Sequence, residues 1–322
     1  MNLIVRQYCE MKDAVAWDEF CAKSLQATLL HTRRFLSYHG DRFIDRSLII
    51  ESDGDYVGLF PAAESPHDSS ILISHPGISY GGIVHQGRLR GSYMVEALLS
   101  ICKFYTSLGY SKLTYKVVPT IYHRTAAQDD LYALFKIGAI RQRCDLSCAI
   151  SLEHRLPISQ RRRRCLKKAM RSDLKILHGK IYISSLWKIV SENLINKYGV
   201  IPTHSLNEIN NIANLFPENV SCICVAINDE VLAGVLLFST ENTSHAQYIT
   251  SNSAGNDISA LDFLFDHCIK HAHNEGKMWF DFGISNEEQG KYLNNDLYKF
   301  KSEFGGGGIV HEFYDIDLIS TK

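Results

Sequence analysis

Two glycines that close predicted helices recur at a fixed spacing in the second half of the chain. Gly109 and Gly276 are 167 residues apart, and so are Gly138 and Gly305. The later glycine of each half follows a helical pattern with aromatic residues, which are Tyr132 and Phe135, then Phe300 and Phe304. A constant offset across two elements indicates an ancient duplication with a period near half of the 322 residues.

The same order of elements is predicted in both halves of the chain. Two β-rich runs flank a short turn, and a third strand, a polar or Gly-rich loop, an amphipathic helix and another strand follow. They occupy residues 47–60, 71–75, 79–91, 95–108 and 112–117, and then 220–238, 246–250, 252–257, 261–272 and 278–282. We therefore predict an α/β protein with mixed sheets and two tandem domains, residues 1–153 and 154–322, joined near 153–159.

Motifs near the end of the chain resemble a known family. Residues 280–283 (Phe-Asp-Phe-Gly), 297–301 (Leu-Tyr-Lys-Phe-Lys) and 304–305 (Phe-Gly) resemble the ending of FemAB-type transferases, which carry two GNAT acyltransferase domains in tandem. Residues 31–36, 75–77 and 80–82 resemble relatives found in gene clusters for surface polysaccharides such as O-antigen. The resemblance implies two GNAT-like domains and an acyl-CoA-dependent N-acyltransferase.

The resemblance also implies a substrate. The relatives move an acyl group, acetyl or 3-hydroxybutanoyl, from acyl-CoA to the amine of a nucleotide-linked amino sugar, such as a dTDP-linked 3-amino-3,6-dideoxyhexose. Two alternatives stay open: a FemX-like ligase of cell-wall precursors that uses aminoacyl-tRNA, and a binding module that kept the fold without its chemistry. The basic run from Arg161 to Arg164 favours tRNA, whereas the net charge of −1 disfavours nucleic acid.

Residues for the donor and the acceptor follow from the resemblance. Loop amides at the start of a helix can bind a diphosphate, and the second half offers Thr250, Gly255, Asn256 and Ser259 for coenzyme A. This loop departs from the superfamily's phosphate motif, since Gly255 is its only glycine. The acceptor is expected at four positions of the first half: Arg34, Tyr80, Gly81 and Gly82. A turn that only shapes the backbone is the alternative for both loops.

Four residues are candidates for the chemistry. Lys301 matches a lysine that steadies negative charge in FemAB-type transferases. Asp281 alternates with Phe280 and Phe282 on a strand, so it faces away from them and could be a base or an amine anchor. His75 and Tyr248 follow or end strands where the fold opens its cleft. Each also has a structural interpretation. Lys301 could be a lysine on a helix surface and Asp281 a turn cap, whereas His75 could be a core histidine and Tyr248 a packed aromatic ring.

Bulk properties narrow the remaining classes. The chain has no apolar run of the length that a membrane helix needs and no signal-peptide core, so we expect a cytoplasmic protein with no membrane partner. The nine cysteines include no C-x-x-C pair, which predicts reduced thiols and no metal. A second copy of the chain stays open as a partner.

Overall fold

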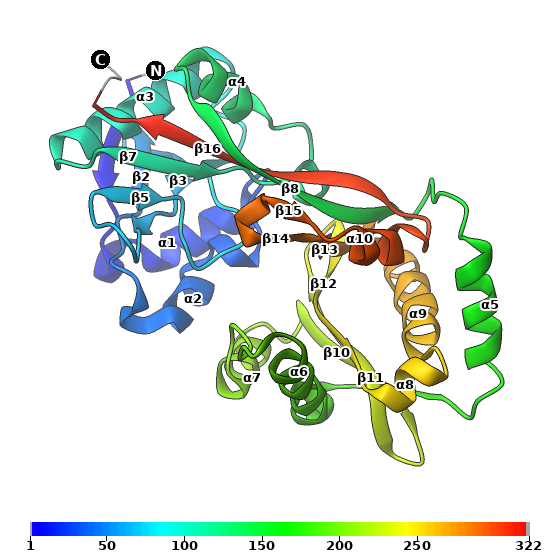
Figure 1. Cartoon of the computed structure of the whole chain (residues 1–322). Coiled ribbons are helices and arrows are strands. Elements are labelled where there is room, and N and C mark those ends of the chain that lie inside the picture. Colours follow the sequence, from blue (N-terminus) through cyan, green and yellow to red (C-terminus); the bar gives the residue numbers. More distant parts are fainter. Residues whose placement is uncertain (1, 320–322) are drawn as a thin grey trace. The chain divides into compact units, whose positions relative to one another are not determined.

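The computed structural model describes residues 2–319, apart from the side chains of Lys197 and Tyr198. These residues form two compact units (Figure 1). Unit 1 contains residues 2–145, 288–292 and 310–319, and unit 2 contains 146–287 and 293–309. The division differs from a single junction at 153/154, because the chain passes between the units inside β8 (Ile140–Ser151) and again inside β16 (Gly307–Asp317).

Unit 1 contains two small sheets. One has the order β1-β2-β3-β6, and in the other β5 pairs with β4 and β7, and β7 pairs with the end of β16. Its strands are β1 (Ile4–Gln7), β2 (Leu48–Ser52), β3 (Asp55–Phe60), β4 (Ala63–Glu64), β5 (Ile71–Ile73), β6 (Val84–His85) and β7 (Lys112–Lys116). Its helices are α1 (Glu10–Lys23), α2 (Arg33–Leu36), α3 (Ser92–Ser107) and α4 (Asp129–Lys136), with short 3-10 segments at 29–31, 37–42 and 120–122.

The first sheet of unit 1 is buried on both faces. Trp17 and Phe20 of α1 pack on Ile49 and Leu59, whereas α3 packs on the alternate residues of the same strands. Because successive side chains of a strand point to opposite faces, each strand contributes side chains to the core under α1 and to the core under α3. The predicted hairpin at 47–60 is confirmed, since β2 and β3 are antiparallel neighbours.

Unit 2 contains one sheet with the order β9-β10-β11-β12-β13-β8, in which only β12 and β13 are parallel. Its strands are β9 (Lys175–His178), β10 (Val220–Ile227), β11 (Glu230–Ser239), β12 (Thr243–Ser251) and β13 (Trp279–Ile284). Its helices are α5 (Gln160–Ala169), α6 (Ile183–Tyr198), α7 (Leu206–Leu215), α8 (Ser253–Asp257), α9 (Ala260–Asn274) and α10 (Asn295–Ser302). Short pieces of unit 2 lie at 180–182 and 286–287 (β14). The turn at 288–290 belongs to unit 1, and β15 (292–293) lies where the chain returns to unit 2.

Helices cover both faces of the unit 2 sheet. Helix α9 lies on one face, and α6 and α7 lie on the other (Figure 1). Leu264, Phe265 and Cys268 of α9 belong to a buried cluster with Val235 and Phe280. On the other face, a Cβ at Gly234 would come within 2.7 Å of Leu186 Cδ1, so this glycine lets α6 approach β11 closely.

Helix α5 opens with Ser159, whose hydroxyl accepts a hydrogen bond from the backbone of Arg162. The Arg162 side chain is buried, forms ion pairs with Asp262 and Glu303, and lies over the ring of Phe300. The other arginines of the run, Arg161, Arg163 and Arg164, are exposed. The basic run is therefore a solvated helix surface with a single anchoring arginine.

Candidate active site

The two parallel strands of unit 2 part in the middle of the sheet. Strand β12 pairs with β13 at only three positions, of which the last joins His245 to Asp281. Beyond this pair β12 continues to Ser251 along β11 alone. Its register against β11 shifts at the same place, because Ala246 and Tyr248 oppose consecutive residues and Gln247 is extra. Such β-bulges are common next to active sites.

A histidine and a carboxylate meet where the strands part. His245 Nδ1 lies 2.7 Å from Oδ2 of Asp281, which is fully buried. Oδ1 of Asp281 accepts hydrogen bonds from the Ser147 hydroxyl at 2.5 Å and from the Gly283 amide at 3.0 Å. These two donors fix the orientation of the buried carboxylate. The carboxylate in turn holds the His245 proton on Nδ1, so the lone pair of the imidazole is on Nε2.

Lys301 contacts the same turn from α10. Its ammonium donates hydrogen bonds to the carbonyl oxygens of Gly283 at 3.0 Å and of Ile284 at 2.6 Å. Gly283 has a φ of 77°, and a Cβ there would lie 3.3 Å from the His245 ring. Burial lowers the pKa of Lys301 to about 8, although the charge of Asp281 opposes this shift. Two of the predicted residues, Asp281 and Lys301, are thus brought to one place.

The equivalent position of unit 1 lacks these groups. Its parallel strands, β5 and β7, also pair at three positions, and the last of them joins Ile73 to Thr114. Thr114 and Asp281 are separated by the same 167 residues as the paired glycines. An isoleucine and a threonine therefore stand where unit 2 has His245 and Asp281. Only unit 2 carries an acid–base pair at the point where the parallel strands end.

The predicted donor loop uses its amides within its own turns. The Gly255 amide donates to Oδ1 of Asn252 at 2.8 Å, and the amides of Asn256 and Ser259 donate to backbone oxygens of the loop. A Cβ at Gly255 would come within 2.7 Å of the Leu232 carbonyl oxygen, so the glycine permits close packing on β11. Thr250, at the end of β12, accepts a hydrogen bond from the Asn193 side chain at 2.7 Å. The loop is folded as the short helix α8, and it is not an open cradle of amides.

The residues predicted for the acceptor lie in unit 1. The Gly81 amide donates to the Lys116 carbonyl oxygen, and a Cβ at Gly82 would lie 2.7 Å from the Tyr115 hydroxyl. Tyr80 is buried, and its ring lies 4.6 Å from that of Tyr122. These three residues are packed into the unit. Arg34 is exposed on α2.

His75 is the predicted catalytic residue of unit 1. It has a left-handed backbone with a φ of 57°, and its Nδ1 accepts a hydrogen bond from the Gly77 amide. Burial, reinforced by the charge of His39, lowers the pKa of His75 well below its usual value. These contacts and the burial of His75 match its interpretation as a structural histidine.

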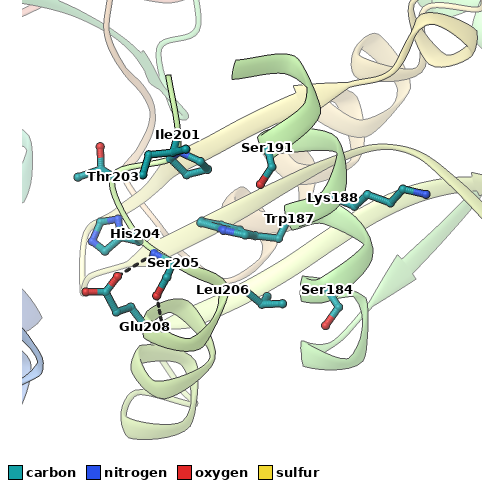
Figure 2. A pocket seen from close by; sticks show the side chains of 11 residues that line it. Ser184, Trp187, Lys188, Ser191, Ile201, Thr203, His204, Ser205, Leu206 and Glu208 are labelled. Carbon is teal, nitrogen blue, oxygen red and sulfur yellow. Dashed lines mark hydrogen bonds between the residues drawn. The ribbon is translucent and has the colours of Figure 1, made fainter. Parts of the chain in front are cut away.

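Tyr248 lies inside β12, directly after the bulge. Its hydroxyl is 2.5 Å from Nδ1 of His204, and its ring packs edge-on against Trp187 of α6. Burial raises the pKa of the phenol to about 12, so Tyr248 donates this hydrogen bond. His204 and Trp187 also line a groove of about 580 Å³ that lies between α6 and residues 201–208 (Figure 2).

Sequence reasoning missed His245 and His204. His245 lies just before the strand predicted from Ala246, so it fell outside that strand. Its partner Asp281 is 36 residues further along the chain. Asp281 was recognised by its alternation with two phenylalanines, whereas His245 stands between Ser244 and Ala246 and has no such pattern around it. On β11, Phe238 lies opposite His245 and Leu237 lies opposite Ala246. Leu237 and Ala246 belong to the core cluster under α9, so His245 faces away from that cluster.

Two further properties concern the residues from 2 to 319. None of the helices in this range is both long and apolar enough to cross a membrane. Within the same range, no three histidine, cysteine or acidic side chains are arranged to hold a metal ion.

Comparisons with known proteins agree with this architecture. Residues 205–299 match a family model described as an acetyltransferase (GNAT) domain. No curated protein matches the chain. Among solved structures, FemX covers 98% of this chain and 97% of its own, with a TM-score of 0.67 and 12% identity. L-PGS from Bacillus licheniformis covers 88% of this chain and 86% of its own, with a TM-score of 0.59 and 12% identity.

A tandem GNAT protein from the clavulanic acid biosynthesis pathway covers 98% of this chain and 99% of its own, with a TM-score of 0.55 and 9% identity. At these identities the similarity concerns the fold. The predicted α/β fold with GNAT-like domains is confirmed. The domain match in unit 2 also confirms the prediction of an acyltransferase.

Proposed function

We propose that the chain is an N-acyltransferase that moves an acyl group from acyl-CoA to the amine of a nucleotide-linked amino sugar. The observation that carries this proposal is the His245–Asp281 pair, which stands where β12 and β13 part. The match of residues 205–299 to the GNAT acetyltransferase domain supports it. A dTDP-linked 3-amino-3,6-dideoxyhexose is the acceptor that we assign, and acetyl or 3-hydroxybutanoyl is the acyl group.

His245 is the general base of the proposed reaction. The amine nitrogen forms a bond to the thioester carbonyl carbon, the bond from that carbon to sulfur breaks, and the thiolate of CoA leaves. Nε2 of His245 accepts the proton that the amine loses, and that proton neutralises the leaving thiolate. Asp281 stabilises the imidazolium between these events because its carboxylate already accepts from Nδ1.

Lys301 provides charge at the same centre. An ammonium has three donors, and two of those on Lys301 reach the carbonyl oxygens of Gly283 and Ile284. We assign the third to the oxyanion that develops on the thioester carbonyl, as the resemblance to FemAB-type transferases implies.

A covalent intermediate on cysteine is not part of the proposal. Cys148 lies close enough for the charges of Lys301 and Asp281 to affect it, yet burial raises its pKa to about 12. A thiol with such a pKa is protonated at neutral pH and is a poor nucleophile. The amine therefore attacks the thioester directly.

The donor fits between β12 and β13. The described residues of β12 beyond His245 do not pair with β13. The amide groups of a pantetheine chain can therefore hydrogen-bond to the edge of β12 there. The diphosphate is assigned to the region of Thr250, Gly255, Asn256 and Ser259. Because the amides of the last three are engaged in the loop, we expect side chains to supply part of the binding.

An aminoacyl-tRNA-dependent ligase is the second candidate. The structural similarity to FemX and the exposed cations Arg161, Arg163 and Arg164 of α5 favour it. Both reactions need an amine acceptor and an activated acyl donor, so the donor distinguishes them.

A donor assay tests the proposal. Purified full-length protein is given dTDP-3-amino-3,6-dideoxyhexose with acetyl-CoA, 3-hydroxybutanoyl-CoA or aminoacyl-tRNA, and the product is identified by mass spectrometry. We expect N-acylated sugar and free CoA thiol in equal amounts with an acyl-CoA. Transfer from aminoacyl-tRNA alone would establish the ligase, and no transfer from any donor would contradict both functions.

A further inference from the structure

The groove in unit 2 has the chemistry of a sugar site. It lies between α6 and residues 201–208 and measures about 580 Å³, within the range of small-molecule sites. Its lining is Ser184, Trp187, Lys188, Ser191, Ile201, Pro202, Thr203, His204, Ser205, Leu206 and Glu208. Figure 2 shows α6 on one side of Trp187 and the segment with Thr203 and His204 on the other. We propose that this groove binds the sugar ring of the acceptor, an inference that rests on the proposed function.

The groove opens on the same face of the sheet as the His245–Asp281 pair. Ala246 and Phe280 belong to the cluster under α9, so their neighbours His245 and Asp281 point to the α6 face. The extra residue at Gln247 then places Tyr248 on that face too, where it contacts Trp187. Three residues of a strand span about 10 Å, so Tyr248 lies about 10 Å from His245 along β12, and we place the amine of the bound sugar on the side of the groove that faces His245.

Hydroxyl groups dominate the polar lining. Ser184, Ser191 and Thr203 come from both walls and can hydrogen-bond a ring with several hydroxyls. Lys188 and Glu208 add one cation and one anion, so the groove has no excess of charge that would favour a polyanion. Glu208 and Ser205 bond each other's backbone amides and are thereby held in place as a capping box.

Tyr248 fixes the tautomer of His204 in the groove. The Tyr248 phenol is protonated, because burial raises its pKa to about 12, and it donates to Nδ1 of His204. The proton of a neutral His204 is therefore on Nε2. His204 and the buried indole of Trp187 both line the groove.

Variants of the groove test the assignment. Ser191→Leu fills it from α6, and Thr203→Val removes one hydroxyl with almost no change in volume. With dTDP-3-amino-3,6-dideoxyhexose and acetyl-CoA, we expect the KM for the sugar to rise about 10-fold or more in Ser191→Leu and severalfold in Thr203→Val. The KM for acetyl-CoA should stay within about 2-fold of the wild type. Ser185→Leu, exposed on the same helix and outside the lining, is the matched control.

The outcomes separate this inference from the proposed function. If the wild type acylates the sugar but both variants keep its KM, the groove is not the acceptor site, whereas the proposed function stands. If the variants raise the KM for acetyl-CoA and leave that for the sugar unchanged, the groove belongs to the donor and the inference is wrong. If the wild type acylates no amino sugar from any acyl-CoA, the proposed function fails and the inference fails with it.

Discussion

His245 and Asp281 face each other at the last rung of a parallel ladder, with Nδ1 of the histidine 2.7 Å from Oδ2 of the aspartate. The aspartate is fully buried and has two further donors, so its position is set by the fold. Burial and fixed donors favour one orientation of the imidazole before any substrate binds, which is the preorganisation that proton transfer requires.

Asp281→Asn should abolish most of the activity while the protein stays folded. The asparagine oxygen can keep the bonds from Ser147 and Gly283, so its amide NH₂ faces Nδ1 of His245 and forces the imidazole proton onto Nε2. The same change of tautomer in a serine-protease triad costs about 10⁴-fold in kcat. We expect a loss of kcat on the order of 10³-fold, measured by release of CoA thiol. Ser147→Ala leaves the tautomer intact and should cost less than about 10-fold; equal losses in the two variants would refute the tautomer argument.

The activity should fall as the pH rises through the pKa of Lys301. Burial lowers this pKa to about 8, so the ammonium becomes neutral above that pH and can no longer stabilise an oxyanion. In Lys301→Arg the charge persists to much higher pH, and the decline in kcat near pH 8 should disappear. Lys301→Met should lower kcat about 100-fold and change the KM for acetyl-CoA little. A loss of thermal stability with unchanged kcat would instead assign Lys301 to structure alone.

Arg162 should be the one arginine of its run that stabilises the fold. Arg162→Met leaves the buried carboxylate of Asp262 and the partly buried one of Glu303 without their cation, at a cost of about 3 kcal/mol in the free energy of unfolding. Arg163→Met changes an exposed neighbour and should cost less than about 0.5 kcal/mol. Equal costs would contradict the structure of this contact.

The cost of losing Arg162 should depend on pH. Burial raises the pKa of Asp262 to about 6 even with Arg162 present, so removal of the arginine should raise it further. Because the folded state then binds the proton more tightly than the unfolded state, folding stability falls as the pH rises through this range. We expect a smaller deficit at pH 5 than at pH 7.5, and chemical denaturation at both values measures it.

Gly255→Ala should destabilise unit 2 by about 1–3 kcal/mol. The added Cβ would lie 2.5 Å from Oγ of Ser251 and 2.7 Å from the Leu232 carbonyl oxygen, and the second of these atoms belongs to the backbone. Gly307→Ala is the control, because a Cβ there meets nothing within 4 Å. An unchanged melting temperature for Gly255→Ala would mean that α8 is not packed on β11 as described.

Local patterns were sufficient to predict much of this fold. The glycines at 109 and 276 end α3 and α9, and both hairpins form where alternating apolar runs flank a polar turn. The division into units was harder to predict, since residues 313–317 of β16 pair with β7, about 200 positions earlier in the chain. Pairing across such a distance depends on edges that only the folded sheet exposes.

The site was predicted in part for a similar reason. Asp281 was visible because it alternates with two phenylalanines within one strand. The donor role of Gly255 was inferred from the resemblance and from the place of its loop before a helix, and a turn that uses its own amides can have the same sequence as one that offers them. His245 depends on the register of β12 against β13 and on the bulge at Gln247, neither of which a single strand reveals.

The rate of His245→Gln shows whether this histidine is the base of the reaction. With saturating acetyl-CoA and dTDP-3-amino-3,6-dideoxyhexose, we expect kcat for N-acetylated sugar to fall about 10²–10⁴-fold at pH 7. The KM for acetyl-CoA should stay within about 2-fold, and His273→Gln, exposed on α9, should behave as the wild type. Wild-type kcat in His245→Gln would contradict the assignment of this histidine as the base and of the β12–β13 junction as the active site.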